Sequence, residues 1–257
     1  MKSPTISLCM IVKNEEKHLS GCLDSVRGMV EQVVIVDTGS TDRTVEIARS
    51  HGAAVFFFPW CNDFSAARNE SLRHATGEWI LWLDADERLN CVGTAHCLLE
   101  NASSPDIDAY WVPIRSPKPN EGYDFHYAIR FFRNFPGIHF VGEVHEFVDP
   151  FLLERGANIV RAQFVIEHLG YAIDSLKMEE KLQRNMLLLR KSFERDPDNA
   201  YILYCLGRTL LGLKKERESL ETLKRALHGK GLTPNLHASV LNLITFFHLS
   251  DQDFVQA

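Results

Sequence analysis

The sequence has no apolar run near the roughly 20 residues that a membrane-spanning helix needs. One strongly apolar stretch, Trp79 to Leu83, is ended by Asp84 after five residues. The first residues, Met1 to Pro4, lack the basic and apolar regions that precede the cleavage site of a secretory signal. We therefore expect a cytoplasmic protein without a transmembrane segment.

The cysteines form no C-x-x-C pair, the usual spacing of a zinc or redox site. Several lie within apolar segments, where a reduced thiol behaves as a small hydrophobic group. We therefore expect neither a zinc site nor a disulfide framework. The six cysteines are Cys9, Cys22, Cys61, Cys91, Cys97 and Cys205.

Two common nucleotide-binding motifs are also missing. No G-x-G-x-x-G follows the first expected strand, and no Gly-rich loop ends in Lys-Ser or Lys-Thr. The composition itself is ordinary for a globular protein: 257 residues, of which 45% are hydrophobic, with only 10 prolines. The chain is long enough for one large domain, or for a medium domain with a smaller one.

The charge balance excludes a further class of function. The chain carries 28 Lys and Arg against 34 Asp and Glu, a formal net charge of −6. Residues 1–174 hold 15 basic and 24 acidic side chains (−9), whereas residues 175–257 hold 13 and 10 (+3). Neither part has the basic excess of a nucleic-acid-binding protein.

The first 84 residues alternate short apolar runs with amphipathic segments, the pattern of a parallel sheet with helices between its strands. Nearly continuous apolar runs are typical of strands covered on both faces. Helices are expected at about 15–27, after 37–42 with Ser40 or Thr41 as the cap, and from Asn62-Asp63 to about His74. The expected strands are Ile6 to Val12, Gln32 to Asp37, Ala54 to Phe58 and Trp79 to Leu83.

The character of the sequence changes twice more. Beyond residue 105, apolar runs separated by Pro and Gly predict an antiparallel or mixed extension of the sheet. Its strands are expected at 110–112, 127–132, 139–144 and 159–166. From residue 174 onward almost every segment is helical, with helices expected at 175–195, 200–213, 216–228 and 234–249.

The helical tail matches the 34-residue tetratricopeptide pattern in part. Counted from Ala200 as position 1, four residues fall where the pattern places them: Leu206, Gly207, Leu210 and Ala226. Ser219 replaces the usual Ala and Pro234 falls three residues late, so a generic helical hairpin remains the alternative. We expect an α/β domain at 1–172 and tetratricopeptide-like helical repeats at 173–257, in an array that is incomplete.

Acidic residues follow two of the expected parallel strands. Ligands of an open parallel sheet bind beyond the carboxyl ends of its strands. Asp37 ends the second strand there, and Asp84-Ala85-Asp86 follows the fourth. The Asp-x-Asp pattern also occurs at 106/108, 196/198 and 251/253, but in polar or turn-like surroundings. Two carboxylates at the edge of a core need a cation, and Mg²⁺ or Mn²⁺ suits such oxygen ligands and the phosphates they bridge to.

Four segments carry motifs: I-S-L-C-M-I-V-K-N-E-E (6–16), V-V-I-V-D-T-G-S-T-D (33–42), W-C-N-D-F-S-A-A-R-N (60–69) and A-T-G-E-W-I-L-W-L-D-A-D-E (75–87). Together they resemble the inverting family 2 glycosyltransferases of the GT-A fold, and most closely the bacterial branch with tetratricopeptide repeats after the catalytic domain. A weaker similarity continues through F-F-R-N (131–134), V-H-E (144–146) and I-E-H-L-G-Y (166–171). The resemblance implies an α/β fold, a GT-A-type mostly parallel sheet with helices on both faces, followed by an all-α helical-repeat tail.

The resemblance also implies which residues bind the nucleotide-sugar. Val12 and Asn14 would line the nucleotide pocket, and Asp37 would contact the base or ribose. Arg68 would lie near the uracil or the diphosphate. Asp84-Ala85 would lie near the ribose and the metal.

The metal ligands and the catalytic base follow from the same resemblance. Asp86 would bind Mn²⁺ or Mg²⁺ directly, with Asp84 beside it, and His168 matches the late histidine that completes the metal site in many GT-A enzymes. Glu146 occupies the place of the catalytic carboxylate. The motif here is V-H-E rather than the commoner Glu-Asp pair, which leaves Glu143 and His145 as rival bases.

Each of these residues could also have a purely structural role. Asp37 and Asp42 would serve as caps of the second helix, and Arg68 as a cation on a helix surface. His168 would be a half-buried histidine with satisfied hydrogen bonds, and Glu146 an ordinary carboxylate at the end of a strand.

The sequence thus predicts a metal-dependent, inverting glycosyltransferase of the hexosyltransferase class, with a UDP-sugar as donor. We expect the helical tail to present a polypeptide acceptor through Ser, Thr or Cys, with a growing saccharide as the alternative acceptor. Two other classes remain open: a non-catalytic, nucleotide-sensing scaffold whose repeats bind a protein partner, and a metal-dependent nucleotidyltransferase.

Overall fold

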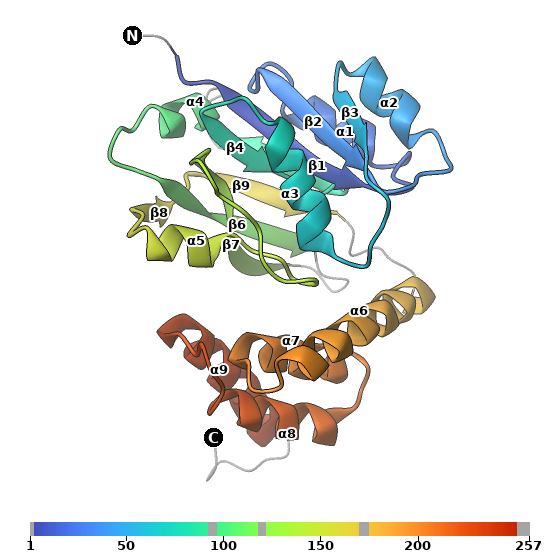
Figure 1. The fold of residues 1–257 in the computed structure, drawn as a ribbon, viewed down its shortest axis with the longest axis vertical. Coiled ribbons are helices and arrows are strands. Elements are labelled where there is room, and N and C mark those ends of the chain that lie inside the picture. The colour runs from blue at the N-terminus through green and yellow to red at the C-terminus, as the bar shows by residue number, and fades with distance from the viewer. Residues whose placement is uncertain (1–2, 92–96, 118–121, 170–174, 251–257) are drawn as a thin grey trace. The chain divides into compact units, whose positions relative to one another are not determined.

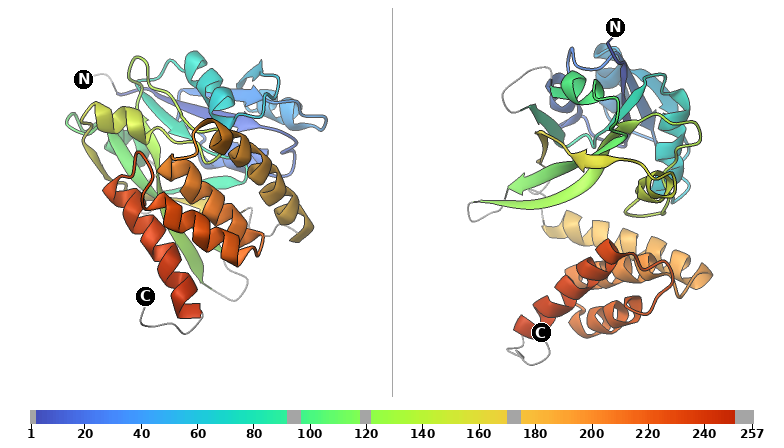
Figure 2. Two further views of the ribbon diagram at one scale, coloured as in Figure 1. Left: turned by 60° about the horizontal axis from the view of Figure 1, so that its bottom comes forward. Right: turned by 90° about the vertical axis from the view of Figure 1, so that its left-hand side faces the viewer.

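The computed structural model describes residues 3–91, 97–117, 122–169 and 175–250 (Figure 1). The chain forms two compact units. The first comprises Met1–Gly142 and Glu146–Ala172, and the second comprises Glu143–His145 and Ile173–Ala257. The first unit holds the sheet, and the second consists mainly of helices (Figures 1 and 2).

The described strands of the first unit join in one mixed, nine-stranded sheet with the order β3-β2-β1-β4-β7-β6-β9-β5, in which β8 pairs with β6. β1 to β4 run parallel to one another, and β7 joins β4 in the antiparallel sense. The strands are β1 (Ile6–Val12), β2 (Gln32–Asp37), β3 (Ala54–Phe57), β4 (Trp79–Trp82), β5 (Glu87–Cys91), β6 (Ala109–Pro117), β7 (Tyr123–Arg133), β8 (Ile159–Arg161) and β9 (Phe164–His168).

Helices cover both faces of this sheet. One apolar cluster joins Leu19 of α1, Ala48 of α2 and Leu98 of α4 to one face. A second cluster joins Leu72 of α3 and Leu152 of α5 to the other face. The helices are α1 (Leu19–Ser25), α2 (Thr44–Ser50), α3 (Phe64–His74), α4 (Cys97–Ala102) and α5 (Asp149–Glu154). The predicted α/β fold, with a mostly parallel sheet covered on both faces, is confirmed.

Local hydrogen bonds explain where the first helices begin. α3 begins as predicted, because the side chain of Asp63 accepts a hydrogen bond from the N–H of Ala66 (3.1 Å) and caps the helix. The expectation of a helix from residue 15 is wrong, since α1 begins only at Leu19. The N–H of Glu15 donates to Thr44 Oγ1, on the first residue of α2, and the N–H of Glu16 donates to Asp42 Oδ2.

The cap predicted for the second helix is also corrected. Ser40 and Thr41 do not cap α2, because both contact Asn14. Asp42 lies closer to the helix, and its Oδ1 accepts a hydrogen bond from the N–H of Thr44, the first residue of α2 (3.0 Å). Asp42 therefore has the structural role that its sequence position allowed, as a hydrogen-bond acceptor at the start of α2.

Two predicted strands of the second half differ from the structure. Residues 139–144 form no strand, and only an isolated bridge joins Val141 to Phe147. Gly142 and His145 have φ values of 98° and 59°, and such left-handed residues interrupt an extended chain. The predicted strand at 159–166 is divided into β8 and β9, which pair with different parts of β6. No sequence pattern had indicated β5, α4 or α5.

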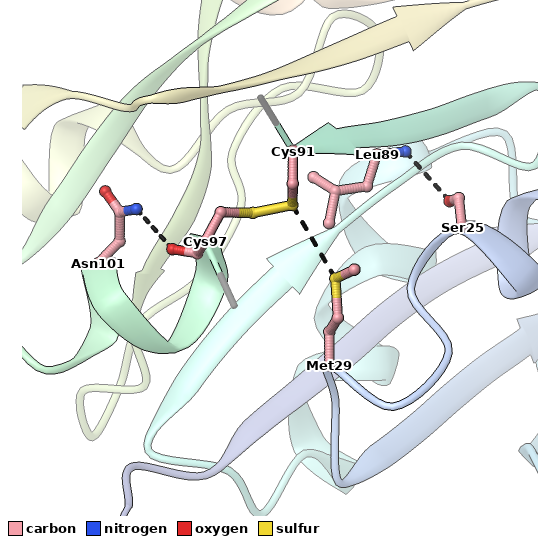
Figure 3. Close-up of a disulfide and its surroundings, with 6 residues drawn as sticks. All are labelled: Ser25, Met29, Leu89, Cys91, Cys97 and Asn101. Atoms are coloured by element: carbon pink, nitrogen blue, oxygen red, sulfur yellow. Dashed lines mark hydrogen bonds between the residues drawn. A yellow bond between two sulfur atoms is a disulfide. The ribbon is translucent and has the colours of Figure 1, made fainter. Parts of the chain in front are cut away.

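The sequence predicted no disulfide framework, but the structure contains one disulfide. Cys91 at the end of β5 and Cys97 at the start of α4 form a disulfide, with their Cα atoms 5.8 Å apart (Figure 3). Met29 lies beside it, with its sulfur 4.0 Å from that of Cys91. The pair is six residues apart in sequence and became recognisable only once the strand and the helix brought the two sulfurs together. The other cysteines are free.

The second unit contains four helices within the described residues: α6 (Ser175–Arg195), α7 (Ala200–Gly212), α8 (Glu216–Ala226) and α9 (Pro234–Ser250). Their bounds agree closely with the sequence prediction. α7 and α8 cross closely at Gly207, where a Cβ atom would come within 2.7 Å of the side chain of Leu223. Among the described residues, each helix is too short or too polar to cross a membrane.

Candidate active site

Neighbouring parallel strands end at one edge of the sheet. Val12 of β1 lies opposite Asp37 of β2, and Cys9 of β1 lies opposite Trp82 of β4. Asp84 follows Trp82 by two residues. This edge is where α/β sheets bind their ligands. The predicted nucleotide-binding residues of β1, β2 and β4 therefore lie at the carboxyl ends of adjacent strands.

Reciprocal hydrogen bonds join the loops after β1 and β2. The N–H of Asn14 donates to Ser40 Oγ (2.9 Å), and its Oδ1 accepts from the N–H of Thr41 (2.8 Å). Asn14 has a φ of 57°, which asparagine adopts more readily than most residues. Asp37 is fully buried and accepts hydrogen bonds from the N–H groups of Gly39 and Ser40. Asn14 and Asp37 are therefore held in fixed positions beside each other's loops.

Arg68 of α3 lies among acidic side chains and is only 5% exposed. Its Nη2 donates to Asp84 Oδ1 (2.7 Å), and its Nε donates to Glu146 Oε1 (2.5 Å). Burial alone would lower the pKa of this guanidinium, but the charges of Asp84 and Glu146 outweigh burial and raise the pKa above its ordinary value. Arg68 is therefore not a surface cation, and Glu146 is one of its two ion-pair partners.

Asp86 and His168 meet although 82 residues separate them. His168 Nε2 lies 3.1 Å from Asp86 Oδ2, and its Nδ1 lies 3.3 Å from Ser116 Oγ. The hydrogen bond with Asp86 raises the pKa of His168 above its ordinary value, although burial opposes the shift. The antiparallel pairing of β5 with β9 produces this contact, because it places His168 opposite Glu87, the residue after Asp86.

Two charged residues of the site, Glu87 and Arg130, were missed by sequence reasoning. Glu87 Oε1 accepts a hydrogen bond from Arg130 Nη2 (2.9 Å), and both side chains are buried. Burial raises the pKa of Glu87, and the charge of Arg130 opposes that shift. The sequence contained a signal for each: Glu87 directly follows Asp86, and Arg130 interrupts an apolar run, where a buried charge needs a partner.

The donor atoms of the site are suitable for a divalent metal. The four carboxylates, from Asp84, Asp86, Glu87 and Glu146, outnumber the three guanidiniums, from Arg68, Arg130 and Arg88, the last of which donates to the carbonyl oxygens of Ala85 and Glu87. Mn²⁺ and Mg²⁺ bind carboxylate oxygens, and an imidazole nitrogen such as that of His168 suits a transition metal. In the part of the chain that the structure describes, no three His, Cys, Asp or Glu side chains are gathered to hold a metal ion. Of the three predicted metal ligands, the structure brings Asp86 to His168 and directs Asp84 to Arg68.

The rival bases, Glu143 and His145, belong to the second compact unit. Glu143 accepts hydrogen bonds from Ser192 Oγ (2.6 Å) and from Arg195 Nη2. Burial lowers the pKa of His145 to about 4, with the charge of Arg208 acting in the same direction. Glu146, by contrast, belongs to the first unit together with Arg68 and Asp84.

Comparisons with known proteins show which family the chain resembles. Residues 7–151 match the model of the family "Glycosyl transferase family 2". A TPR repeat-containing protein of Synechococcus elongatus is 34% identical over 95% of this chain and 60% of its own length. The SPbeta prophage-derived glycosyltransferase SunS of Bacillus subtilis is 30% identical over 88% of this chain and 54% of its own length. The chain thus spans little more than half the length of these two relatives.

A solved structure shows the same fold. The crystal structure of residues 1–349 of TarS from S. aureus matches 98% of this chain and 91% of its own, with a TM-score of 0.56 and 16% sequence identity. At this identity the match supports the fold alone. The match to the family model, by contrast, covers more than half of the chain and contains β1 to β4 with Arg68, Asp84, Asp86 and Glu146. The chain therefore belongs to glycosyl transferase family 2.

Proposed function

We propose that the chain transfers a sugar from a nucleotide-sugar, with a UDP-sugar as the first donor to test, to a polypeptide acceptor. The transfer inverts the anomeric carbon and requires a divalent metal. One observation carries this proposal: the carboxylates of Asp84, Asp86 and Glu146 gather with Arg68 and His168 beyond β4. Membership of glycosyl transferase family 2 supports the reaction class.

The nucleotide would bind at the ends of β1 and β2. Val12, Asn14 and Asp37 lie there, and hydrogen bonds between the two loops hold that surface in place before any ligand arrives. Preorganisation lowers the entropy lost on binding. TarS, which shares the fold, has been crystallised in complex with UDP and with UDP-GlcNAc, and these ligands are therefore suitable first probes.

Asp86 and His168 would hold the metal, with Asp84 and Ala85 nearby at the same turn. A divalent cation bound there would neutralise the charge that builds on the leaving diphosphate, an effect worth several kcal/mol. The excess of carboxylates over guanidiniums in the site supports such a cation, since an anionic diphosphate would otherwise be repelled.

Glu146 would remove the proton from the acceptor as the acceptor attacks the anomeric carbon. In a single displacement the attacking group and the leaving group lie on opposite faces of the sugar, so the configuration inverts. Arg68 supports this role because its Nε fixes Glu146 Oε1. In the described part of the chain no hydrogen bond engages the second oxygen, Oε2, which is the atom that would accept the proton.

The helical unit would bind the acceptor. We treat its helices as tetratricopeptide-like repeats, which commonly hold extended or helical peptides. Within this unit α6, α7 and α8 line a groove that contains both apolar and charged side chains: Met186, Arg190, Phe193, Leu206, Leu210, Glu218, Glu221, Thr222 and Arg225. A groove of this mixed character supports a polypeptide over a purely saccharide acceptor.

The direct test is release of UDP. The protein is incubated with Mn²⁺ and UDP-glucose or UDP-GlcNAc, and slow hydrolysis of the donor is expected even without an acceptor. The absence of UDP from every donor, with and without candidate acceptors, would favour a nucleotide-sensing scaffold. Formation of pyrophosphate from UTP and a sugar phosphate would favour a nucleotidyltransferase.

The acceptor is tested by a charge reversal in the groove. Arg190→Glu is expected to reduce glycosylation of a polypeptide acceptor and to leave hydrolysis of the donor unchanged, because tethering acts only on the acceptor's effective concentration. Lys191→Glu is the matched control, since Lys191 is exposed on the same helix, α6, and does not line the groove. Equal glycosylation by the parent and Arg190→Glu would exclude the groove as the acceptor site.

A further inference from the structure

Glu87 closes the turn that carries the two aspartates. Its N–H donates to the carbonyl oxygen of Asp84 (3.0 Å), and its Oε2 accepts a hydrogen bond from the N–H of Asp84 (2.8 Å). One residue therefore holds both the N–H and the carbonyl group at the start of the turn, from which the side chains of Asp84 and Asp86 extend. The side chain of Glu87 is only 2% exposed.

The other oxygen of Glu87 binds Arg130, which connects Glu87 through Trp82 to Arg68. Arg130 Nη2 donates to Glu87 Oε1 (2.9 Å), and the guanidinium carbon of Arg130 lies 3.4 Å from the centroid of the Trp82 ring. The guanidinium carbon of Arg68 lies 4.0 Å from the same centroid. Trp82 is itself fixed, because its Nε1 donates to the carbonyl oxygen of Ile129 (2.8 Å).

These contacts form one connected group of buried side chains. Glu87 binds the turn, Arg130 binds Glu87, and Trp82 packs against Arg130 and Arg68, which binds Asp84 and Glu146. A buried ion pair adds little net stability, because the loss of hydration offsets most of the attraction between the charges. Stability alone is therefore a weak reason for a buried Glu87–Arg130 pair at this position.

We propose that Glu87 and Arg130 are positioning residues for the transfer reaction, which set Asp84 and Asp86 relative to Arg68 and His168 without contacting donor or acceptor. The inference rests on the proposed function. A displacement of about 1 Å in a reacting geometry can lower a rate about 10²-fold, so loosening this turn should reduce turnover far more than it reduces folding.

The same strand provides a matched control. Arg133 also lies on β7, its guanidinium carbon is 4.7 Å from the Trp79 ring of β4, and its Nε is 3.8 Å from Asp108 Oδ1. Arg130 and Arg133 thus each stack on a tryptophan of β4 and each pair with a carboxylate, Arg130 with Glu87 of β5 and Arg133 with Asp108 just before β6. Only Arg130 does so at the carboxyl end of β4, next to the acidic turn.

The variants to compare are Glu87→Gln, Arg130→Met, the double variant Glu87→Leu/Arg130→Met, and the control Arg133→Met. For each, kcat and KM for UDP release in Mn²⁺ are measured together with the thermal unfolding temperature. Glu87→Gln and Arg130→Met are expected to lower kcat about 10²-fold with little change in KM for the donor. The control is expected to keep the parental kcat.

The double variant separates positioning from stability. Replacing both buried charges by apolar groups of similar size often restores or raises stability. We therefore expect an unfolding temperature near that of the parent together with a kcat that stays about 10²-fold low. A double variant with parental kcat would show that the pair is only structural. An equal loss of kcat in Arg133→Met would show that removing an arginine from either tryptophan of β4 lowers kcat, wherever it lies. Either result overturns the proposal.

Failure of the proposed function gives a different result. If the parent releases no UDP from any donor, calorimetric titration with Mn²⁺ alone decides, because Asp86 would hold the ion in either case. We expect binding about tenfold weaker in the double variant than in the parent. Equal affinity for Mn²⁺ in the two proteins would overturn the positioning role independently of any activity.

Discussion

The Asp-x-Asp pattern occurs both at Asp84/Asp86 and at Asp196/Asp198, and the two places differ in everything except those letters. Asp84 binds a buried arginine and Asp86 binds His168, at the end of a strand that is completely buried. Asp198, in the turn between α6 and α7, is 64% exposed and lies 3.7 Å from the ammonium of Lys230, which is itself exposed.

The difference shows what makes such a pair useful for catalysis. Water screens the charges at Asp196 and Asp198, so an exposed ion pair there contributes about 0–1 kcal/mol and holds no fixed geometry. At Asp84 and Asp86 two partners from distant parts of the chain fix the side chains, because Arg68 binds Asp84 and His168 binds Asp86. Glu87 fixes the backbone of the same turn, and Glu146 holds Arg68 in place. Burial and partners, rather than the motif, therefore distinguish the candidate site.

The largest effect is expected from Asp86→Ala. Because Asp86 would hold the metal, its loss should lower transfer by at least about 10³-fold, corresponding to several kcal/mol of charge stabilisation. Metal-dependent binding of UDP should be lost as well, while the fold stays intact, since removing one carboxylate from an acidic site relieves repulsion. Equal UDP affinity of the variant and the parent by calorimetry in Mn²⁺ would contradict the assignment.

Glu146→Gln should have the next largest effect. The amide is nearly isosteric, so UDP affinity should be kept while transfer falls roughly 10²- to 10⁴-fold, the usual contribution of a general base. Rates of UDP release with acceptor present measure this. Glu143→Gln and His145→Ala are the comparisons, and an active Glu146→Gln together with an inactive neighbour variant would assign the base to that neighbour.

A smaller effect concerns pH. The proton on His168 competes with the metal, and its pKa is raised, so affinity for Mn²⁺ should fall about tenfold per pH unit below that pKa. His168→Gln should remove this dependence.

The pH dependence of folding stability has the opposite direction. Without metal, the contact of His168 with Asp86 stabilises the fold below the ordinary pKa of 6.5, and this contribution is lost as pH rises through the raised pKa. Calorimetry measures the Mn²⁺ affinity and urea unfolding measures the stability, each at several pH values. A Mn²⁺ affinity that does not fall at low pH, or a stability that does not fall as pH rises, would contradict the corresponding prediction.

Asp196→Ala should have the smallest effect and sharpens the comparison with Asp86→Ala. Asp196 Oδ2 accepts one hydrogen bond, from Asn199 Nδ2 (3.1 Å), and Asn199 can still cap α7 through its Oδ1. We expect parental transfer and a change in unfolding free energy within about 0.5 kcal/mol, measured with urea. A loss of transfer in this variant would show that the exposed pair is functional after all.

Much of the fold was predictable because local signals agree with it. The continuous apolar runs of β1 and β2 predicted these strands to the residue, and Asp63 marked the start of α3 as its N-cap. The strand predicted at 139–144 was wrong. The apolar residues there do not pair with a neighbouring strand over a stretch, and residues in the left-handed conformation such as Gly142 interrupt the extended chain. The Cys91–Cys97 disulfide was not predicted, because its formation depends on where β5 ends relative to the start of α4.

The sequence alone determined the family, through four motifs within residues 6–87. It also determined the acidic character of the site, because aspartates directly after a buried parallel strand lie at the edge where such a sheet binds its ligands. Only the tertiary structure determined which charged side chains of the site contact one another. Arg68 meets Glu146 across 78 residues, Asp86 meets His168 across 82, and Glu87 meets Arg130 across 43. Such contacts depend on strand order and on antiparallel pairing between distant segments, which no local sequence pattern specifies, since the same residue types would satisfy many alternative pairings.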